Sequence, residues 1–422
     1  METVHIIGGG LSGLSCAVSL IKNKKKKINI YEASGIFGGR CRSYKEKKLN
    51  CILDNGNHLI INAYKNTFKY LNEINALDEL ISNKTTFYPF IEINKLKKWN
   101  VRPYSFIFPW WIFFKSCRPL NISFLEFIKS LKIIFAKKNQ KVTDIIKKNE
   151  LIYNRFWKPF TIAVLNTNPN EASARLLSKI ILKILFFQNN PLKPFMAKNS
   201  LDKTFIKPAI KRIKESGGVL KTNSRLKKIE FQKNQAKKII FNDKIINLKK
   251  NDALVLAVTP NIISKILPYL KTPKKSNCIL NIHYKLNSKI KPIKMPNNSF
   301  FIGIIGGMID WIFKKGNVIS ITISAANKLN NIDDKKISKI IWKEIEKIFD
   351  LGKNEIPNHK IIREKMATFV QSPREIYKKP EATTKYKNIF LAGDWIDTGL
   401  PATIEGAITS GYNVTNIINK LK

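Results

Sequence analysis

The strongest constraint on the fold is a glycine-rich loop near the start of the chain, set between two apolar runs. The first run, residues 4–7, is rich in β-branched side chains and predicts a buried strand of a parallel sheet. It leads into Gly8-Gly9-Gly10-Leu11-Ser12-Gly13, which fits G-x-G-x-x-G, and apolar residues then recur at helical spacing. A second strand is expected over residues 28–31, followed at once by Glu32, 19 residues after Gly13. This order predicts a dinucleotide-binding strand–helix–strand unit.

Each glycine of the loop has a physical task. Gly8 permits the tight turn, Gly10 lets a pyrophosphate approach the backbone, and Gly13 lets the helix pack against the strand. The free N–H groups that open the helix, at Leu11 and Ser12, face the pyrophosphate, where the helix dipole favours an anion. The acid at the tip of the second strand can accept hydrogen bonds from a ribose hydroxyl. A glycine-rich turn without a ligand is the alternative.

A second glycine pair narrows the choice of cofactor. Residues 31–40 end in Gly38-Gly39-Arg40, and this run resembles the FAD-containing amine oxidase and phytoene desaturase superfamily. In that superfamily the glycine pair and the arginine lie against the FAD diphosphate. A nicotinamide-dependent dehydrogenase does not need this extension, so the resemblance implies that the cofactor is FAD. The alternative is a surface turn with an incidental arginine.

A further motif follows the last predicted strand. Residues 388–392 are largely apolar and lead to Gly393-Asp394, and the loop before the final amphipathic helix contains Ala402-Thr403-Ile404. Unpaired N–H groups at the start of a helix can point at an electron-rich acceptor. In flavoenzymes that acceptor is the pyrimidine side of the isoalloxazine, and Asp394 would bind the ribityl chain. A plain terminal helix is the alternative.

These features predict an α/β fold of the amine-oxidase and phytoene-desaturase type, and 422 residues are enough for two domains. A discontinuous Rossmann-like FAD-binding domain, with a parallel sheet and crossover helices, is expected from residues 1–80, 200–260 and 385–422. In the superfamily, the strand near Leu226 reaches the adenine side of FAD through backbone groups. The rest is assigned to an α+β substrate-binding domain: residues 81–199 and 261–384.

Two helices are expected between these motifs. Apolar residues share one face over residues 65–80, which predicts a helix of that length. Another helix is expected to begin near Tyr153 and to end before Pro159, because proline interrupts helical hydrogen bonding.

The substrate domain contains an aromatic stretch, residues 99–135, whose densest part is residues 104–114. This part cannot span a bilayer, because a spanning helix takes about 20 apolar residues. Two interpretations stay open. The stretch is a surface that dips into a membrane, since tryptophan and flanking lysine suit the interface, or it is a wall of the substrate cavity. Both imply a lipophilic ligand.

The formal net charge of +45 needs an explanation. All but ten of the 75 basic residues are lysine, and asparagine and isoleucine are also abundant, as expected from an A/T-rich coding sequence. No recognisable nucleic-acid-binding module accompanies the charge, so nucleic acid is not expected as a partner. An anionic membrane surface is the favoured partner, because each lysine near such a surface contributes about 1 kcal/mol.

The cysteine and histidine patterns exclude other classes of protein. The five cysteines are scattered without a C-x-x-C pair, which favours a reducing compartment and argues against disulfides or a zinc site. The four histidines form no H-x-x-x-H pair, so no metal is expected. The chain enters its first strand at once, which leaves no room for a signal peptide and predicts a cytoplasmic location.

Longer stretches resemble one family more closely. Residues 53–58, 156–159, 367–373 and 392–407 are similar to the squalene-associated FAD-dependent desaturase family. Its members act as hydroxysqualene dehydroxylases in bacterial squalene and hopanoid synthesis. The similarity runs over the whole chain and is most specific in the last motif. Four residues depart from the family pattern but leave the fingerprint glycines in place: Gly9, Ser12, Asn57 and Asn62.

The resemblance implies a reduction, in which hydroxysqualene loses its allylic hydroxyl as water and receives hydride from reduced FAD. Departure of the hydroxyl needs a proton donor. His58 is the first candidate for donating this proton or orienting the hydroxyl, and Tyr64 is the second. Electrons would come from NADPH or a reductase. The protein is expected to be peripheral, on the inner face of the cell membrane.

Three rival functions stay open. A polyprenoid or carotenoid desaturase and an amine-type oxidase share the FAD fold, but a desaturase would oxidise its substrate and need an electron acceptor. The third rival is a non-catalytic basic protein that binds membranes or nucleic acid. A purified protein without flavin would favour that third function.

Overall fold

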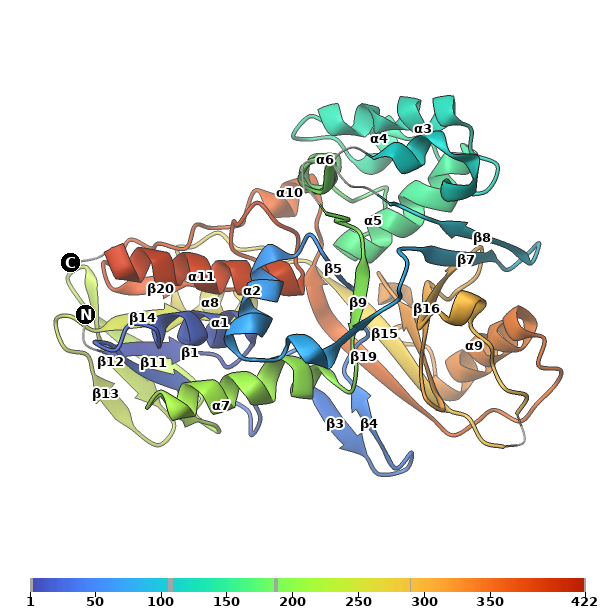
Figure 1. Ribbon diagram of the computed structural model, residues 1–422. Coiled ribbons are helices and arrows are strands. Elements are labelled where there is room, and N and C mark those ends of the chain that lie inside the picture. Colours follow the sequence, from blue (N-terminus) through green and yellow to red (C-terminus); the bar gives the residue numbers. More distant parts are fainter. Residues whose placement is uncertain (1–2, 105–108, 186–188, 289, 421–422) are drawn as a thin grey trace.

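A five-stranded parallel sheet forms around the strand that precedes the glycine loop (Figure 1). The structure is a computed structural model that describes residues 3–104, 109–185, 189–288 and 290–420. The strand order is β10-β2-β1-β14-β20, and every neighbouring pair is parallel. Three separated parts of the chain therefore build one sheet. The strands are β1 (Thr3–Ile7), β2 (Lys27–Tyr31), β10 (Val219–Lys221), β14 (Ala253–Leu256) and β20 (Ile389–Leu391).

Both faces of the parallel sheet are covered, which explains why β1 is apolar throughout most of its length. Val4 and Ile6 pack with helices α1, α2, α7 and α11. Ile7 faces the opposite side and packs with a three-stranded antiparallel sheet and helix α8. The helices are α1 (Leu11–Leu20), α2 (Lys65–Glu73), α7 (Lys207–Glu215), α8 (Pro260–Ile266) and α11 (Ile404–Lys420), and the strands are β11 (Leu226–Gln232), β12 (Gln235–Phe241) and β13 (Ile245–Asn247).

The helices α1 and α11, from opposite ends of the sequence, approach each other at a glycine. A Cβ atom at Gly411 of α11 would lie 2.2 Å from Ser15 Oγ and 2.4 Å from the carbonyl oxygen of Ser12, both in α1. Ser15 Oγ also donates a hydrogen bond to the carbonyl oxygen of Ile408. The C-terminal helix is thereby fixed against the helix that the glycine loop opens.

A seven-stranded mixed sheet lies beside the parallel sheet in Figure 1. Its order is β19-β15-β18-β17-β16-β7-β8, and only the β7–β16 pair is parallel among the described strands. One face buries Ile341 and Trp342 of helix α9. The other face is polar at β15 and β18, where Asn281 and Thr322 alternate with apolar residues and hydrogen-bond to each other. At β16 and β17 the same face is aromatic, because Phe301, Trp311 and Phe313 belong to the buried cluster of the helices above it. The elements are β7 (Tyr88–Glu92), β8 (Lys97–Val101), β15 (Ser276–Lys285), β16 (Phe301–Ile305), β17 (Trp311–Lys315), β18 (Val318–Ile323), β19 (His359–Phe369) and α9 (Asp334–Phe349).

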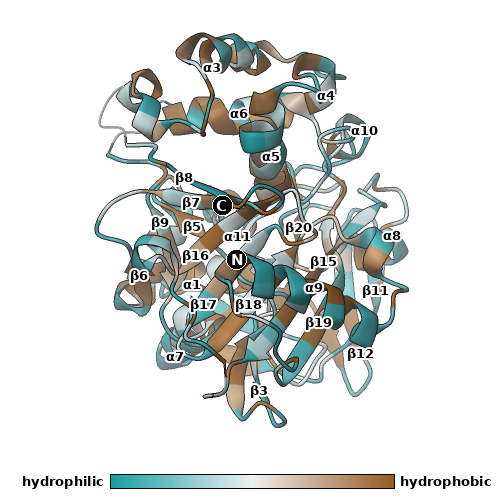
Figure 2. Ribbon diagram, turned by 90° about the vertical axis from the view of Figure 1, so that its right-hand side faces the viewer, coloured by the Kyte–Doolittle hydropathy of each residue, from teal (hydrophilic) through white to brown (hydrophobic). Residues whose placement is uncertain are grey.

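A group of helices, here called the cap, stands above the seven-stranded sheet in both views (Figures 1 and 2). Its core is aromatic: Trp111, Phe127 and Trp157 belong to one buried cluster with Phe90 and Trp99 of the sheet. The cap therefore brings an apolar interior to the edge formed by β7 and β8. Its elements are η2 (Trp110–Phe113), η3 (Lys115–Cys117), α3 (Phe124–Ser130), η4 (Leu131–Phe135), α4 (Val142–Ile145), η5 (Tyr153–Trp157), α5 (Lys158–Leu165) and α6 (Ala174–Leu185).

Short elements connect these larger parts. A hairpin and a small three-stranded sheet, of order β5-β9-β6, are the main ones. The remaining elements are β3 (Ser43–Glu46), β4 (Cys51–Asp54), β5 (Ile60–Ile61), β6 (Leu80–Ser82), β9 (Pro194–Ala197), η1 (Leu77–Glu79), η6 (Asp202–Ile206), η7 (Pro296–Asn298), η8 (Asn327–Leu329) and α10 (Pro373–Ile376).

The helix predicted over residues 65–80 is shorter than expected. It ends at Glu73, because Asn75 adopts a left-handed conformation with a φ of +55° and the Ala76 N–H bonds back to the carbonyl oxygen of Leu71. The chain then forms η1 and β6. Since β6 pairs with the distant strand β9, the local apolar pattern could not reveal it.

The helix predicted to end before Pro159 continues through it. The five residues of η5 form a π-helical segment, and α5 follows with the proline in its first turn. Proline is tolerated there because the first N–H groups of a helical segment need no partner within that segment.

The aromatic stretch, residues 99–135, is divided between interior and surface. Trp111 and Phe127 are buried, whereas Phe114 is exposed. Its residues 105–108 lie outside the described residues. Among the helices that the structure describes, none is long and apolar enough to cross a bilayer. The stretch thus contributes both to the cap core and to an apolar surface.

Candidate functional site

The glycine loop has the geometry that close backbone contact requires. Gly8 has a φ of +109°, and a Cβ atom there would lie 2.3 Å from the carbonyl oxygen of Ala257. A Cβ atom at Gly13 would lie 2.1 Å from the carbonyl oxygen of Gly8. At Gly10, the residue before α1, none of the described atoms lies within 4 Å of the Cβ position. Gly10 therefore leaves space for a phosphate at the helix N-terminus.

The second glycine pair lies directly against this loop. The Gly38 N–H donates to the carbonyl oxygen of Gly9 at 2.8 Å, and Gly38 forms an isolated parallel bridge with Gly10. Gly38 and Gly39 have φ values of +113° and +57°, which side chains other than glycine rarely adopt. The two glycines therefore bring the backbone close to the glycine loop, and the next residue is Arg40.

Arg40 joins the N-terminal motifs to the C-terminal motif. Its Nη2 lies 2.8 Å from Asp394 Oδ1, and its Nη1 donates to the carbonyl oxygen of Ala367. A narrow cavity of about 30 Å³ lies beside this ion pair, with Thr368 and Trp395 among its lining residues. The Asp394 carboxylate raises the pKa of Arg40, so the guanidinium is charged and offers further N–H donors to an anion.

Glu32 is tied to the glycine loop and to the turn that follows it. Its Oε2 accepts from the Gly9 N–H at 2.8 Å, and its Oε1 accepts from the N–H and Oγ of Ser34. A carboxylate has about four acceptor sites, so a ribose hydroxyl can still bind. The Ser224 N–H donates to the Glu32 carbonyl oxygen, which brings the start of β11, Leu226, toward this end of the site.

Two buried polar side chains that sequence reasoning did not single out as site residues hold the loop before α11 and the first turn of that helix. Gln371 Oε1 accepts from the Ala402 N–H at 2.9 Å. The Glu405 carboxylate accepts from the N–H and Oγ1 of Thr67 and from the N–H of Asn66, and thereby caps α2. Burial raises the pKa of Glu405, although these hydrogen bonds oppose the shift.

Tyr64 lies at the same loop. It precedes α2, and its side chain hydrogen-bonds with Thr403, the residue before Ile404 opens α11. Burial and the Glu405 carboxylate raise the pKa of Tyr64, so the phenol stays protonated. The second predicted catalytic residue therefore lies where the isoalloxazine end of the cofactor is predicted.

His58 lies between β4 and β5, next to the polar face of the seven-stranded sheet. Its neighbour Asn57 donates from Nδ2 to Thr322 Oγ1 at 3.1 Å, and Thr322 Oγ1 donates to Asn281 Oδ1 at 2.8 Å. Burial lowers the pKa of His58, and the Asp54 carboxylate opposes this shift only in part. The imidazole is therefore neutral at neutral pH.

Asp310 is an acid near the same strand that sequence reasoning missed. Its Oδ2 accepts from the Ser324 N–H at 2.6 Å, and its own N–H donates to the Thr322 carbonyl oxygen at 3.2 Å. Burial raises the pKa of Asp310 to about 6, although this hydrogen bond and Lys158 favour the charged form. No motif surrounds Asp310, and only the pairing of β17 with β18 brings it to Thr322.

Lys379 is a second group that no motif indicated. Its Nζ donates to the carbonyl oxygen of Leu400 at 2.9 Å, in the loop before α11. Burial lowers the pKa of Lys379 to about 8, while the carboxylates of Asp397 and Asp394 favour its charged form. In a chain so rich in lysine, the sequence does not distinguish Lys379 from the other lysines. The fold places it beside the predicted flavin ring.

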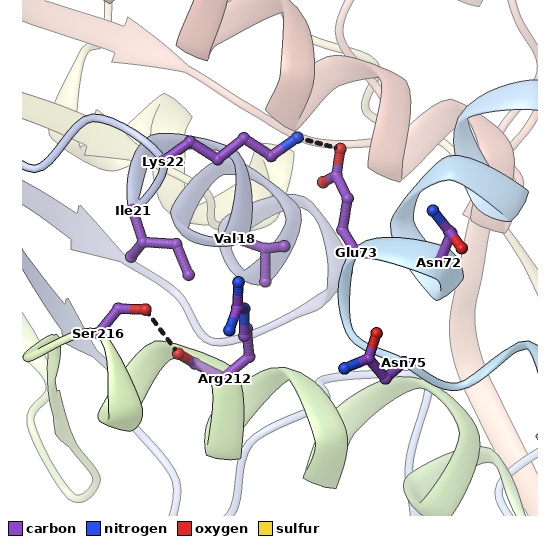
Figure 3. Close-up of a pocket in the computed structure, with 8 residues that line it drawn as sticks. All are labelled: Val18, Ile21, Lys22, Asn72, Glu73, Asn75, Arg212 and Ser216. Carbon is purple, nitrogen blue, oxygen red and sulfur yellow. Dashed lines mark hydrogen bonds and ion pairs between the residues drawn. The ribbon is translucent and has the colours of Figure 1, made fainter.

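A larger cavity, of about 250 Å³, lies elsewhere (Figure 3). Val18, Ile21 and Lys22 contribute to it from the C-terminal end of α1, and Arg212 contributes from α7. Lys22 Nζ donates to Glu73 Oε1 at 2.6 Å across its rim. Because the glycine loop lies at the opposite end of α1, this cavity does not belong to the dinucleotide site.

The structure brings several predicted cofactor residues into contact. Glu32 bonds to Gly9 of the glycine loop, Gly38 pairs with Gly10, and Arg40 joins this part of the chain to Asp394. An acid for a ribose, a cation and helix N-terminus for a diphosphate, and backbone donors for a ring suit FAD. The individual contacts of these residues with the cofactor stay a prediction.

Comparison with known proteins agrees with this arrangement. The family model of flavin-containing amine oxidoreductases matches residues 11–419. The chain belongs to this family. Its cofactor is FAD, and the protein is an FAD-dependent oxidoreductase.

Within that class, the chain is similar to the hydroxysqualene dehydroxylase of Zymomonas mobilis, with 33% identity over 418 residues and 99% coverage of both chains. It is also 24% identical to a 15-cis-phytoene desaturase of an Oncidium hybrid cultivar, over 97% of this chain and 76% of that one. Cyclohexylamine oxidase from Brevibacterium oxydans shares the fold, with a TM-score of 0.72, 13% identity and coverage of 99% and 98%.

Arg40→Gln is expected to weaken FAD binding by more than tenfold. The change removes the ion pair with Asp394 and the positive charge next to the predicted diphosphate position. Flavin retained after desalting and FAD titration of the apoprotein measure the effect. The matched control is Arg374→Gln, an exposed arginine on α10. Equal FAD affinity in the Arg40 variant and the control would contradict the assigned role.

Asp310→Asn is expected to stabilise the protein at pH 8 but not at pH 4. The buried carboxyl keeps its proton up to about pH 6 in the folded state, whereas the unfolded chain releases it near pH 4. The stability contribution of this group is therefore lost as the pH rises between these values, by up to about 3 kcal/mol. Asparagine avoids the loss and can still accept from the Ser324 N–H.

Urea unfolding at both pH values, with flavin-saturated protein, measures this difference. Asp78→Asn, a surface change of the same chemistry, is the control. A pH-independent difference between Asp310→Asn and the unmodified protein would show that the carboxyl is not buried in the folded state.

Proposed function

We propose that the protein reduces hydroxysqualene to squalene in squalene and hopanoid synthesis. The observation that carries this proposal is the similarity to a hydroxysqualene dehydroxylase over 99% of both chains, because that span includes the cap as well as the cofactor site. The phytoene desaturase is less similar and is matched over a smaller share of its length. Desaturation is therefore the second candidate.

The reaction balances with the groups that the site offers. The carbon–oxygen bond of the allylic alcohol breaks, a carbon–hydrogen bond forms, and the hydroxyl takes one proton to leave as water. Reduced FAD supplies the hydride when it is bound. The chain supplies the proton, the orientation of the alcohol and an apolar surrounding in the aromatic core of the cap, which shields an allylic cation from water.

We assign different tasks to the polar groups near Thr322. His58 is neutral, so a ring N–H is suited to hold the alcohol oxygen in place rather than to protonate it. Asp310 has a pKa of about 6 and retains a proton on a carboxyl oxygen in part of the molecules near neutral pH. It is therefore the better proton donor. The protonated Tyr64 phenol, which hydrogen-bonds with Thr403 in the loop before α11, is a third donor.

Two finer parts of the proposal concern the surroundings of the enzyme. We propose that electrons reach FAD from NADPH or from a reductase. We also propose that the protein is cytoplasmic and peripheral, on the inner face of the cell membrane. A hydrocarbon substrate dissolves in the bilayer, and the net charge of +45 favours an anionic surface.

The direction of the reaction tests the function. The enzyme is incubated without oxygen, with a chemical reductant and hydroxysqualene, and the products are identified by mass spectrometry. Squalene is expected in many-fold excess over enzyme. A parallel reaction supplies oxidised enzyme, a quinone acceptor and phytoene. Formation of new conjugated double bonds there, with no squalene in the first reaction, would replace the dehydroxylase by a desaturase.

His58→Ala and Asp310→Asn are each expected to lower the turnover number about 100-fold, the usual scale for general acid catalysis or its loss. Asp310→Asn should also remove a pH-dependent step near pH 6, whereas His58→Ala should keep it. FAD content should not change in either variant. His359→Ala, on β19, is the control. Full turnover of His58→Ala with normal flavin content would end the assignment of His58.

A further inference from the structure

Large apolar side chains gather on the outer surface of the cap. They come from η2, from the residue after it, and from α3 and η4, and their exposed fractions range from 41% at Ile128 to 84% at Phe135. Rings of η2 contact α3, since Phe113 and Phe124 stack with centroids 4.8 Å apart. We call this surface the cap face: Trp110, Phe113, Phe114, Leu125, Ile128 and Phe135.

The cap face is held in a defined conformation. The buried Arg118 guanidinium donates from Nη1 to the carbonyl oxygens of Ile112 and Phe113 and from Nε to that of Ile122. Ser123 then begins α3 with a capping box, in which its side chain and that of Glu126 satisfy each other's backbone N–H. These bonds fix the turns of η2 and α3, so the exposed apolar side chains have a constant outward direction.

Neighbouring residues of η2 and α3 differ in whether they face the interior or the surface. Trp111 and Phe127 belong to the buried cap core, while their neighbours Trp110 and Ile128 are exposed. Both views place α3 at the end of the molecule furthest from α7 and the β3–β4 hairpin (Figures 1 and 2). A group of exposed large apolar side chains at the outer end of a domain is typical of an interaction site.

Charge identifies the kind of partner. Residues 99–138 contain one acidic residue, Glu126, and its carboxylate is used in the capping box. Exposed lysines lie between and after these apolar residues in the sequence: Lys115, Lys129, Lys132, Lys137 and Lys138. Two copies of this face would bring these cations together, whereas anionic headgroups would pair with them. Aromatic rings and lysines together suit a lipid interface.

We propose that the cap face is the docking surface for an anionic lipid bilayer. The apolar side chains enter the headgroup region, and the lysines contact anionic headgroups. The purpose of this docking rests on the proposed function, because a squalene-like substrate is dissolved in the membrane. Binding to lipid itself does not depend on that function.

Sedimentation of the flavin-loaded enzyme with vesicles tests the docking surface. Vesicles of phosphatidylcholine with a quarter phosphatidylglycerol are compared with phosphatidylcholine alone, at low and high salt. Stronger binding to the anionic vesicles and weakening by salt are expected. The double variant Phe114→Ser/Phe135→Ser should bind roughly a hundredfold more weakly, at about tenfold for each lost phenyl group. The control is Ile52→Ser/Ile245→Ser, which removes exposed apolar side chains from β4 and β13.

The lysines are tested in the same way. Lys129→Gln/Lys132→Gln should lower the affinity for anionic vesicles about fivefold per residue, whereas Lys227→Gln/Lys228→Gln on β11 should change it little. Equal losses in both lysine pairs would assign binding to net charge and overturn the docking surface. Unchanged binding of the phenylalanine variant would also overturn it, and so would a concentration-dependent dimer that this variant abolishes.

An assay in detergent micelles separates this proposal from the proposed function. If the cap face docks to lipid, the phenylalanine variant keeps its FAD content and its turnover of micellar hydroxysqualene but loses vesicle binding. If the enzyme turns over no hydroxysqualene in micelles yet binds vesicles through the cap face, the proposed function fails and the docking surface stands.

Discussion

Close contact between backbones is the constraint on which the cofactor site depends. At Gly8, Gly13 and Gly411 a single added carbon would come within 2.4 Å of an oxygen atom of a neighbouring segment. These contacts pull the first strand, the first helix and the last helix together. They also explain why residues from the two ends of a long chain can share one ion pair, Arg40 with Asp394. Backbone packing therefore sets the positions of the site residues, and their side-chain chemistry depends on those positions.

The seven-stranded sheet separates two environments. Its face toward α9 is filled with isoleucine and buries Trp342, which gives the sheet its stability. Its other face carries hydrogen-bonded polar groups, with Asn281, Thr322 and Asn57 forming a chain of contacts. The aromatic core of the cap borders the sheet at β7 and β8. The proposed dehydroxylation needs polar groups for the alcohol oxygen and apolar surroundings for the hydrocarbon chain.

The Rossmann-like fold could be predicted from the sequence because its motifs are local. The fingerprint, Gly38-Gly39-Arg40 and the C-terminal loop each fix a backbone shape within a few residues. Spacing reveals the fingerprint, whereas the other two motifs were interpreted through their resemblance to the superfamily. The predictions of two helix boundaries were wrong, because local backbone conformation and the pairing of distant strands decided the structure there. The helix from Lys65 stops at Glu73 because Asn75 adopts a left-handed conformation, and the chain then forms β6, which pairs with the remote strand β9. Pro159 is accommodated in the first turn of α5, after a π-helical segment.

The polar groups nearest the predicted chemistry were harder to predict. Asp310, Lys379 and Gln371 stand outside any motif, and each reaches the site through pairing or packing with residues far away in sequence. His58 was predicted from the family resemblance, but burial leaves it neutral, which changes the task it can perform. Burial of a titratable group follows from the tertiary structure and is not visible in a single sequence.

A single-turnover experiment tests the central claim most directly. The bound FAD is reduced without oxygen, excess reductant is removed, and the enzyme is mixed with hydroxysqualene while the flavin absorbance is followed. We expect the flavin to reoxidise and one squalene to form for each flavin, with no reoxidation when squalene is added instead. Fully loaded, reduced flavin that stays reduced in the presence of hydroxysqualene would contradict the claim.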